Sequence, residues 1–109
     1  KENKIKSLED YMFTIGSGPE NDFQIIDPMV EKQHAQLRLI GEHYVVFDLD
    51  TLYGTFVNQQ QIRQQTLHPG DVITFGSTRI IYGENRDQPV DQTQDYEPST
   101  TGMVDIGDD

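Results

Sequence analysis

Short runs rich in β-branched and aromatic residues recur between residues 10 and 83, and each run predicts a strand. Within 35–39, Ala35, Leu37 and Leu39 alternate with Gln36 and Arg38, which is the period-two pattern of a strand with one buried face. No segment has the sustained i, i+3, i+4 apolar stripe of an amphipathic helix. The predicted strands are 11–15, 22–26, 34–40, 44–47, 55–57, 72–75 and 78–82.

Turn-forming residues separate these runs. Gly, Pro, Asp and Ser stand at 16–19, 27–28, 41–42, 53–54, 69–70 and 76–77. Gly41-Glu42 joins two apolar runs directly, so residues 35–47 predict a β-hairpin. Many short strands with turns between them and no helices predict an all-β fold, an antiparallel sandwich or barrel.

The end of the chain has a different composition. The whole chain carries 8 Lys and Arg against 19 Asp and Glu, and residues 84–109 hold 8 of these acids and a single base. This segment has too few apolar side chains to offset the entropy of ordering it, so we predict a flexible acidic tail or linker at 84–109. Thr100 and Thr101 are candidate phosphoacceptors within it, and an inert solubilising linker is the alternative. Residues 11–83 form the predicted domain, after a lead-in strand or linker at 1–10.

Composition excludes several classes of function. A chain of 109 residues is one domain, and its net charge of −11 repels phosphate backbones and anionic lipid, which argues against nucleic-acid binding. There is no cysteine, His34, His43 and His68 stand far apart, and no apolar run is long enough to enter a bilayer. We therefore predict no metal, no cofactor and no membrane insertion. Because the chain begins at Lys1 without Met, we expect it to be a piece of a larger protein. No signal peptide is visible, which says little about that larger protein, and we expect the piece to be cytoplasmic or to face the cytoplasm.

The loops contain a set of motifs in one order and spacing: Thr14-Ile-Gly16, Asn21-Asp22-Phe-Gln-Ile25, Asp27, Val30, His34-Ala35, Asp48-Leu49, Gly54-Thr55-Phe-Val-Asn58 and Leu67-x-x-Gly70-Asp71-x-Ile73-x-x-Gly76. Together these motifs resemble the forkhead-associated (FHA) domain over residues 11–83. The resemblance implies an eleven-stranded β-sandwich of Greek-key type, in which loops at one end read phosphothreonine on a partner protein. It also implies two strands before Ile15-Gly16, whereas the residues before Tyr11 can supply one at most. The first strand is then absent or comes from another chain.

Several of these residues suit a role in holding loops. They are Gly16, Asn21, Asp22, His34, Gly54, Thr55 and Asn58. Gly16 and Gly54 stand where strands enter tight loops that often need a positive φ. The side chains of Asn21 and Asp22 can bond amides of the 16–22 loop, and Asn58 can do so for the 51–57 loop. In the resemblance His34 braces the loop at 27–33.

The positions that hold phosphate in the resembled family have changed. The expected Arg after Ile-Gly is Ser17, the expected Ser before x-x-His is Glu31, and the expected hydroxyl residue and Asn before Gly-Thr are Leu52 and Tyr53. Charge-assisted hydrogen bonds to phosphate contribute about 1.5–3 kcal/mol each, and a carboxylate in their place repels the ligand. Lys32 is the remaining nearby cation.

These substitutions predict a non-catalytic interaction module that binds a protein or peptide independently of phosphate, within a larger signalling or assembly protein. Ser17, Glu31, Lys32, Thr51, Leu52 and Tyr53 form its predicted binding face. Tyr53 is either an apolar anchor for the partner or packs on Leu52 or Pro19. Ser17 and Thr51 could still donate hydrogen bonds, so phosphothreonine recognition by an atypical pocket is one alternative.

A structural or oligomerising domain of a larger assembly is another alternative, and the oligomeric state stays open. No nucleophile or phosphate-cradling motif points to an enzyme. Asp48 and Asp50 are better explained as solvated acids at a strand end.

Overall fold

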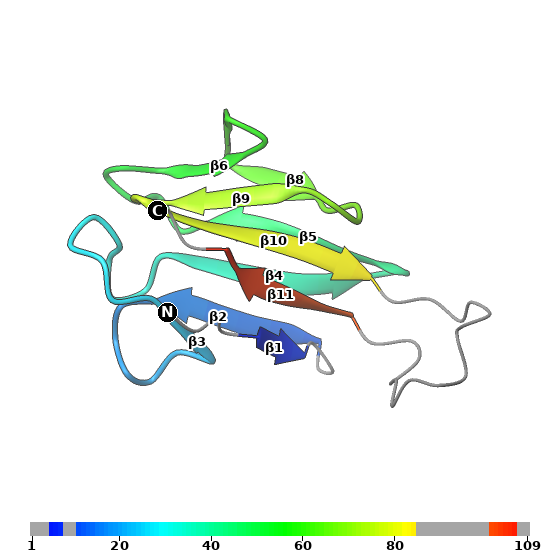
Figure 1. Cartoon of the computed structure of the whole chain (residues 1–109), viewed down its shortest axis with the longest axis horizontal. Coiled ribbons are helices and arrows are strands. Elements are labelled where there is room, and N and C mark those ends of the chain that lie inside the picture. The colour runs from blue at the N-terminus through cyan, green and yellow to red at the C-terminus, as the bar shows by residue number, and fades with distance from the viewer. Residues whose placement is uncertain (1–4, 8–10, 85–100, 107–109) are drawn as a thin grey trace.

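The computed structural model describes residues 5–7, 11–84 and 101–106 of the chain, and these residues form eleven strands without a helix (Figure 1). The strands are β1 (Ile5–Ser7), β2 (Met12–Gly16), β3 (Phe23–Gln24), β4 (Ala35–Ile40), β5 (His43–Asp48), β6 (Thr55–Val57), β7 (Gln60–Ile62), β8 (Gln64–Thr66), β9 (Val72–Phe75), β10 (Thr78–Glu84) and β11 (Thr101–Asp105). No helix among the described residues is long and apolar enough to cross a membrane.

The strands pair into two sheets. One has six strands in the order β1-β11-β10-β9-β6-β7, and the other has five in the order β3-β2-β4-β5-β8. All pairings are antiparallel except that of β2 with β3, which is parallel. The predicted hairpin is present: Ile40 pairs with His43 across a turn in which Gly41 has φ +66°. The predicted all-β sandwich is thereby confirmed.

The core lies between the two sheets because alternate residues of each strand point inward. In β10, Ile80 and Tyr82 are fully buried between more exposed neighbours, and in β4 Ala35 and Leu37 are buried in the same way. The rings of Tyr44 on β5 and Tyr82 on β10 meet edge to face at 6.5 Å between centroids. Aromatic contact therefore joins the two sheets as well as aliphatic packing.

The end of the chain corrects the expectation of a structureless tail over 84–109. Residues 101–105 form β11, which lies inside the six-stranded sheet between β10 and β1. Met103 is fully buried in the core, and Glu84 belongs to β10. A single large apolar residue, placed opposite Tyr82, is enough to hold a strand whose backbone pairs on both sides. The predicted tail residues 85–100 and 107–109 lie outside the described residues.

Three other elements differ from the sequence prediction. The predicted strand 22–26 is reduced to β3, and Ile26 points to solvent with 77% exposure. β7 and β8 were not predicted, because their glutamine-rich sequences lack the β-branched and aromatic residues that indicate strands. One strand, β1, precedes β2, and β11 brings the total to the eleven that the resemblance implied.

Candidate functional site

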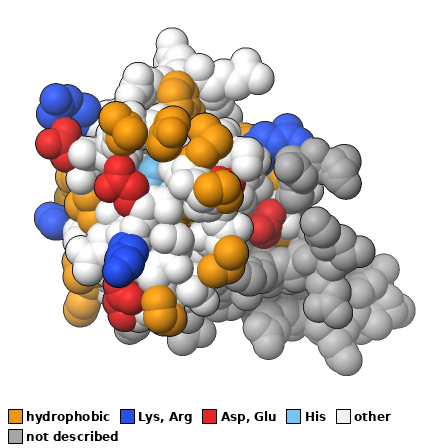
Figure 2. Space-filling model, turned by 90° about the vertical axis from the view of Figure 1, so that its left-hand side faces the viewer, with side chains coloured by type: hydrophobic (Ala, Val, Ile, Leu, Met, Phe, Trp, Pro, Cys, Tyr) orange, Lys and Arg blue, Asp and Glu red, His pale blue; other side chains and the backbone are white. Residues whose placement is uncertain are grey.

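Three loops meet at one end of the sandwich, and we call this the loop end: residues 17–22 after β2, 25–34 before β4, and 49–54 between β5 and β6. Backbone hydrogen bonds join the first two loops, from Ser17 N to Glu31 O at 2.8 Å and from Gly18 N to Lys32 O at 3.3 Å. Figure 2 looks onto the side of the molecule that holds this end. Hydrophobic side chains gather in its upper half, with acidic and basic side chains beside and below them.

The 17–22 loop is closed by its own polar residues. The Asn21 side-chain amide donates to Gly18 O at 2.9 Å and to Lys32 O at 2.6 Å, so it also holds the neighbouring loop. Asp22 accepts from Thr14 N, and its own N–H donates to the Thr14 hydroxyl, both at 2.9 Å. Gly16 is needed for close approach and not for a positive φ, because a Cβ there would overlap the Lys32 carbonyl.

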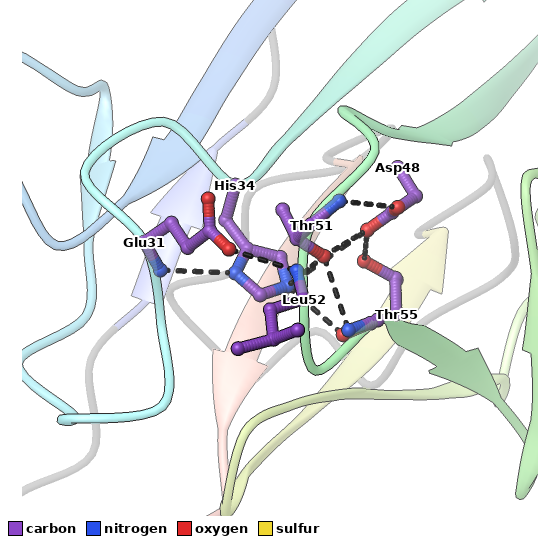
Figure 3. A network of polar contacts seen from close by, with 7 residues as sticks. Glu31, His34, Asp48, Thr51, Leu52 and Thr55 are labelled. Carbon is purple, nitrogen blue, oxygen red and sulfur yellow. Dashed lines mark hydrogen bonds and ion pairs between the residues drawn. The ribbon is translucent and has the colours of Figure 1, made fainter.

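His34 ties the second loop to the third, and its side chain is fully buried. The Glu31 N–H donates to His34 Nδ1 at 3.1 Å, which leaves the ring proton on Nε2. That Nε2–H donates to Gly54 O at 2.9 Å (Figure 3). The Phe75 ring packs edge-on against the imidazole at 5.6 Å. A neutral, fully bonded imidazole inside the core is a structural brace and has no free nitrogen for a ligand.

Asp48 organises the third loop. Its Oδ1 accepts from the hydroxyls of Thr51 and Thr55, both at 2.7 Å, and its Oδ2 accepts from Thr51 N at 3.1 Å (Figure 3). Burial alone would raise the pKa of Asp48, but the hydrogen bonds from Thr55 and Thr51 outweigh it and hold this pKa below its usual value. Asp48 is therefore an ionised acceptor that the loop already uses.

The same network determines what Thr51 can do. A hydroxyl can donate one hydrogen bond, and the Thr51 hydroxyl donates it to Asp48. Its oxygen accepts from Gly54 N at 3.1 Å and lies 3.3 Å from His34 Nε2. The Thr51 hydroxyl therefore already donates to Asp48, and it could donate to a phosphate oxygen only if this arrangement breaks.

Glu31 reaches across the loop end to the third loop. Its Oε2 accepts from the backbone N–H of Leu52 at 2.8 Å (Figure 3). Glu31 is itself exposed, so this hydrogen bond lies on the surface where a ligand would arrive. A carboxylate of the chain therefore occupies a backbone donor that an external anion would otherwise take.

The other predicted face residues surround this contact. Leu52 is 80% and Tyr53 49% exposed, Lys32 is exposed and Ser17 is partly buried. Aromatic side chains such as Tyr53 are enriched at protein interfaces, and the exposed Leu52 adds apolar area beside it. A hollow of about 440 Å³ that sequence reasoning missed adjoins the 49–54 loop; its lining residues are Asp48, Asp50, Thr51, Gln61, Ile62 and Arg63.

Two polar residues act away from the predicted place. Asn58 does not bond the 51–57 loop: its side chain donates to Asp71 Oδ1 and accepts from Val72 N, both at 3.0 Å, so it fixes the start of β9. Asp27, buried to 6% exposure, accepts from Met29 N, Ser77 N and the hydroxyls of Ser77 and Thr78 at 2.7–3.0 Å. These hydrogen bonds join the 27–30 turn to the β9–β10 turn. The sequence could not predict this contact, because the two turns lie far apart along the chain.

The two predicted phosphoacceptors are Thr100 and Thr101. Thr101 begins β11, and Thr100 lies outside the described residues. Among the described residues no group of three His, Cys, Asp or Glu side chains could hold a metal ion. The loop end presents exposed apolar groups at Leu52 and Tyr53 beside the exposed Glu31 carboxylate, which already accepts from Leu52 N, and hydrogen bonds between the loops hold its backbone.

This chain is similar in sequence to several known proteins. The family model of the FHA domain matches residues 13–76. The oxoglutarate dehydrogenase inhibitor of Corynebacterium efficiens is 35% identical over 69 residues, covering 63% of this chain and 49% of that protein. The glycogen accumulation regulator GarA of Mycolicibacterium smegmatis is 33% identical over 67 residues, covering 62% and 42%. The chain thus spans about half the length of the curated relatives it matches.

A solved structure agrees with these sequence matches. It is that of the FhaA FHA domain complexed with the intracellular domain of Rv3910. It superposes with a TM-score of 0.66 at 27% sequence identity, and the alignment covers 73% of this chain and 98% of that chain.

Proposed function

The chain belongs to the FHA family and is a protein-interaction domain, and from this premise we propose that its loop end binds a partner protein without requiring phosphate. The observation that carries this proposal is the hydrogen bond from Leu52 N to Glu31 Oε2. A phosphothreonine dianion would have to displace a carboxylate that is already bonded and stay beside its charge.

Electrostatics makes this displacement unfavourable. Two like charges about 4 Å apart repel by roughly 1–4 kcal/mol between bulk water and a protein surface. Lys32 supplies one exposed positive charge nearby, and the Thr51 hydroxyl already donates its hydrogen bond to Asp48 and not to a ligand. The exposed pair Leu52 and Tyr53 offers apolar contact area in place of ionic ligands.

The relatives support the coarser part of the proposal. They are named as an inhibitor of an enzyme and a regulator, and the FhaA domain was solved with a protein partner. We infer that this chain also acts by binding another protein or peptide, as a non-catalytic module of a larger signalling or assembly protein in the cytoplasm or facing it.

A titration with phosphothreonine peptides and their unphosphorylated forms tests the proposal. The unmodified domain should bind the two forms equally weakly. Ser17→Arg combined with Glu31→Ser should create phosphate-dependent binding. The new guanidinium and the Leu52 N–H, which Glu31 no longer occupies, can then both donate hydrogen bonds to the phosphate. Ser17→Arg alone should gain less, since the Arg would pair with the intact Glu31 carboxylate.

The matched control is Ser17→Arg combined with Glu42→Ser. It has the same net charge as the test variant, but Glu42 lies on the β4–β5 turn, so Glu31 stays on Leu52 N. Phosphate-dependent binding by this control would mean that total charge and not the Glu31 contact decides. Micromolar, phosphate-dependent binding by the unmodified domain would contradict the proposal and support phosphothreonine recognition by an atypical pocket.

A further inference from the structure

β11 is the last of the described strands, yet it lies in the interior of a sheet. It pairs with β10 from Ile80↔Asp105 to Glu84↔Thr101 and with β1 from Ile5↔Val104 to Ser7↔Gly102. β1 has no other partner among the described strands. If β11 leaves, β1 loses its pairing and β10 becomes an open edge, with Tyr82 and Ile80 no longer covered by Met103.

The connection into β11 is far longer than the geometry requires. Glu84 and Thr101 are register partners, so the two ends that must be joined lie about 5 Å apart. An antiparallel pair needs a connection of roughly two to five residues. Here sixteen residues, 85–100, join them, and a chain of that length can extend about 50 Å. The connection therefore permits β11 to reach a second molecule.

The side chains of β11 hold it at few points. Met103 is fully buried, whereas Gly102, Val104 and Asp105 are partly exposed. Gly102 pairs with Gly83, so neither side of this rung carries a side chain. Backbone pairing with β10 and β1 and the buried Met103 side chain hold the strand, and any copy of the same five residues satisfies both equally well.

We propose that β11 is an exchangeable strand: in a dimer of this chain, each copy inserts Thr101–Asp105 between β10 and β1 of the other. The occupant is a second copy, because its residues reproduce every pairing that β11 makes within one chain. The exchange is reciprocal, so it closes as a two-fold dimer in which β10 and β1 keep the same strand neighbours. A connection of sixteen residues sets an effective concentration of about 1 mM for the strand of the same chain. The dimer therefore forms near that protein concentration and is rare well below it.

The absence of cysteine allows a direct test. Gly83→Cys and Gly102→Cys are made in separate copies of the full chain, because paired residues lie within the distance that a disulfide spans. A Cβ at Gly83 meets nothing within 4 Å. The two variants are mixed under oxidising conditions at about 1 mM and at about a hundredfold lower concentration. We expect a covalent heterodimer as the main product at the higher concentration and as a minor one at the lower.

Two controls make either result decisive. Gly83→Cys mixed with Glu42→Cys measures disulfides formed by random collision, because residue 42 lies on the β4–β5 turn. The double variant Gly83→Cys with Gly102→Cys should form its disulfide within one chain when dilute. If it does, and the mixed single variants give no more heterodimer than the collision control, the proposal is wrong.

If the double variant also fails to close, β11 does not pair with β10 and the proposal is equally wrong. Should Gly102→Cys prevent folding, Glu84→Cys with Thr101→Cys tests the adjacent rung in the same way. None of these measurements uses a binding partner, so their outcome is independent of the phosphate question.

Discussion

Replacing Asp27 by Asn should destabilise the domain strongly, although the two side chains have nearly the same shape. The Asp27 carboxylate accepts four hydrogen bonds, two from the backbone amides of Met29 and Ser77 and two from the hydroxyls of Ser77 and Thr78. The two amides face different carboxylate oxygens. In Asn one of these oxygens becomes an NH₂ group, which cannot accept from a backbone N–H.

The magnitude follows from these contacts. A buried donor left without an acceptor costs about 1–3 kcal/mol, and the remaining bonds weaken because they no longer end on a charge. The free energy of unfolding should therefore fall by about 2–4 kcal/mol at neutral pH. Asp50→Asn is the matched control: Asp50 is exposed and has φ +62°, a conformation that Asn tolerates, so its change should be small.

The effect should depend on pH. Burial by itself raises the pKa of Asp27, but the hydrogen bonds from Ser77, Met29 and Thr78 outweigh it and bring this pKa below 3.8, its ordinary value. The stabilisation by the carboxylate is therefore complete well above pH 3.8 and is lost as the pH falls through the lower pKa of the folded state. The difference between wild type and Asp27→Asn should shrink in that range.

Urea unfolding followed by far-ultraviolet circular dichroism, from neutral pH to below pH 3, measures both effects. Equal stability of wild type and Asp27→Asn at neutral pH would refute the clamp between the 27–30 turn and the β9–β10 turn. A difference that stays constant into acid would refute the lowered pKa as its cause.

Two further substitutions test packing and backbone. Met103→Ala should lower the free energy of unfolding by about 2–5 kcal/mol, because it removes a fully buried side chain between β10 and β1; an unchanged urea midpoint would mean that β11 is not packed in solution. Gly54→Ala should lower the free energy of unfolding by about 1–3 kcal/mol, because φ is +85° at this residue and its carbonyl must stay in place to accept the hydrogen bond from His34 Nε2. Calorimetry that shows no loss of stability would contradict this strain.

The sequence predicted those parts of the fold whose signal is local. The alternation over 35–39 identified β4, and Gly41-Glu42 identified the turn into β5, because a strand with one buried face and a tight turn each leave a pattern in adjacent residues. β7 and β8 left no such pattern, since their glutamines are exposed and their pairing with β6 and β5 depends on distant residues.

β11 is a second element that no local sequence pattern predicted. Among residues 102–105 of this strand the Met103 side chain is the buried one, and β10 and β1 pair with the strand on either side. Composition alone therefore favours disorder there.

At the loop end the changed ligand positions stay a prediction from the resemblance, and the sequence could not show which hydrogen bonds the residues there make. The fold determines the side-chain directions on which two hydrogen bonds depend. Glu31 accepts one from Leu52 N, and Thr51 donates the other to Asp48.

The bonds between the loops have a consequence for how fast and how tightly a partner can bind. Ser17 N holds Glu31 O, the Asn21 amide holds Lys32 O, and His34 holds Gly54 O, so each loop is fixed to its neighbour before any encounter. Binding then orders few backbone dihedrals of this domain, and the entropy loss on association falls mainly on the partner. Association should proceed as a single diffusional step without a preceding conformational exchange, and differences in affinity between partners should appear mainly in the dissociation rate.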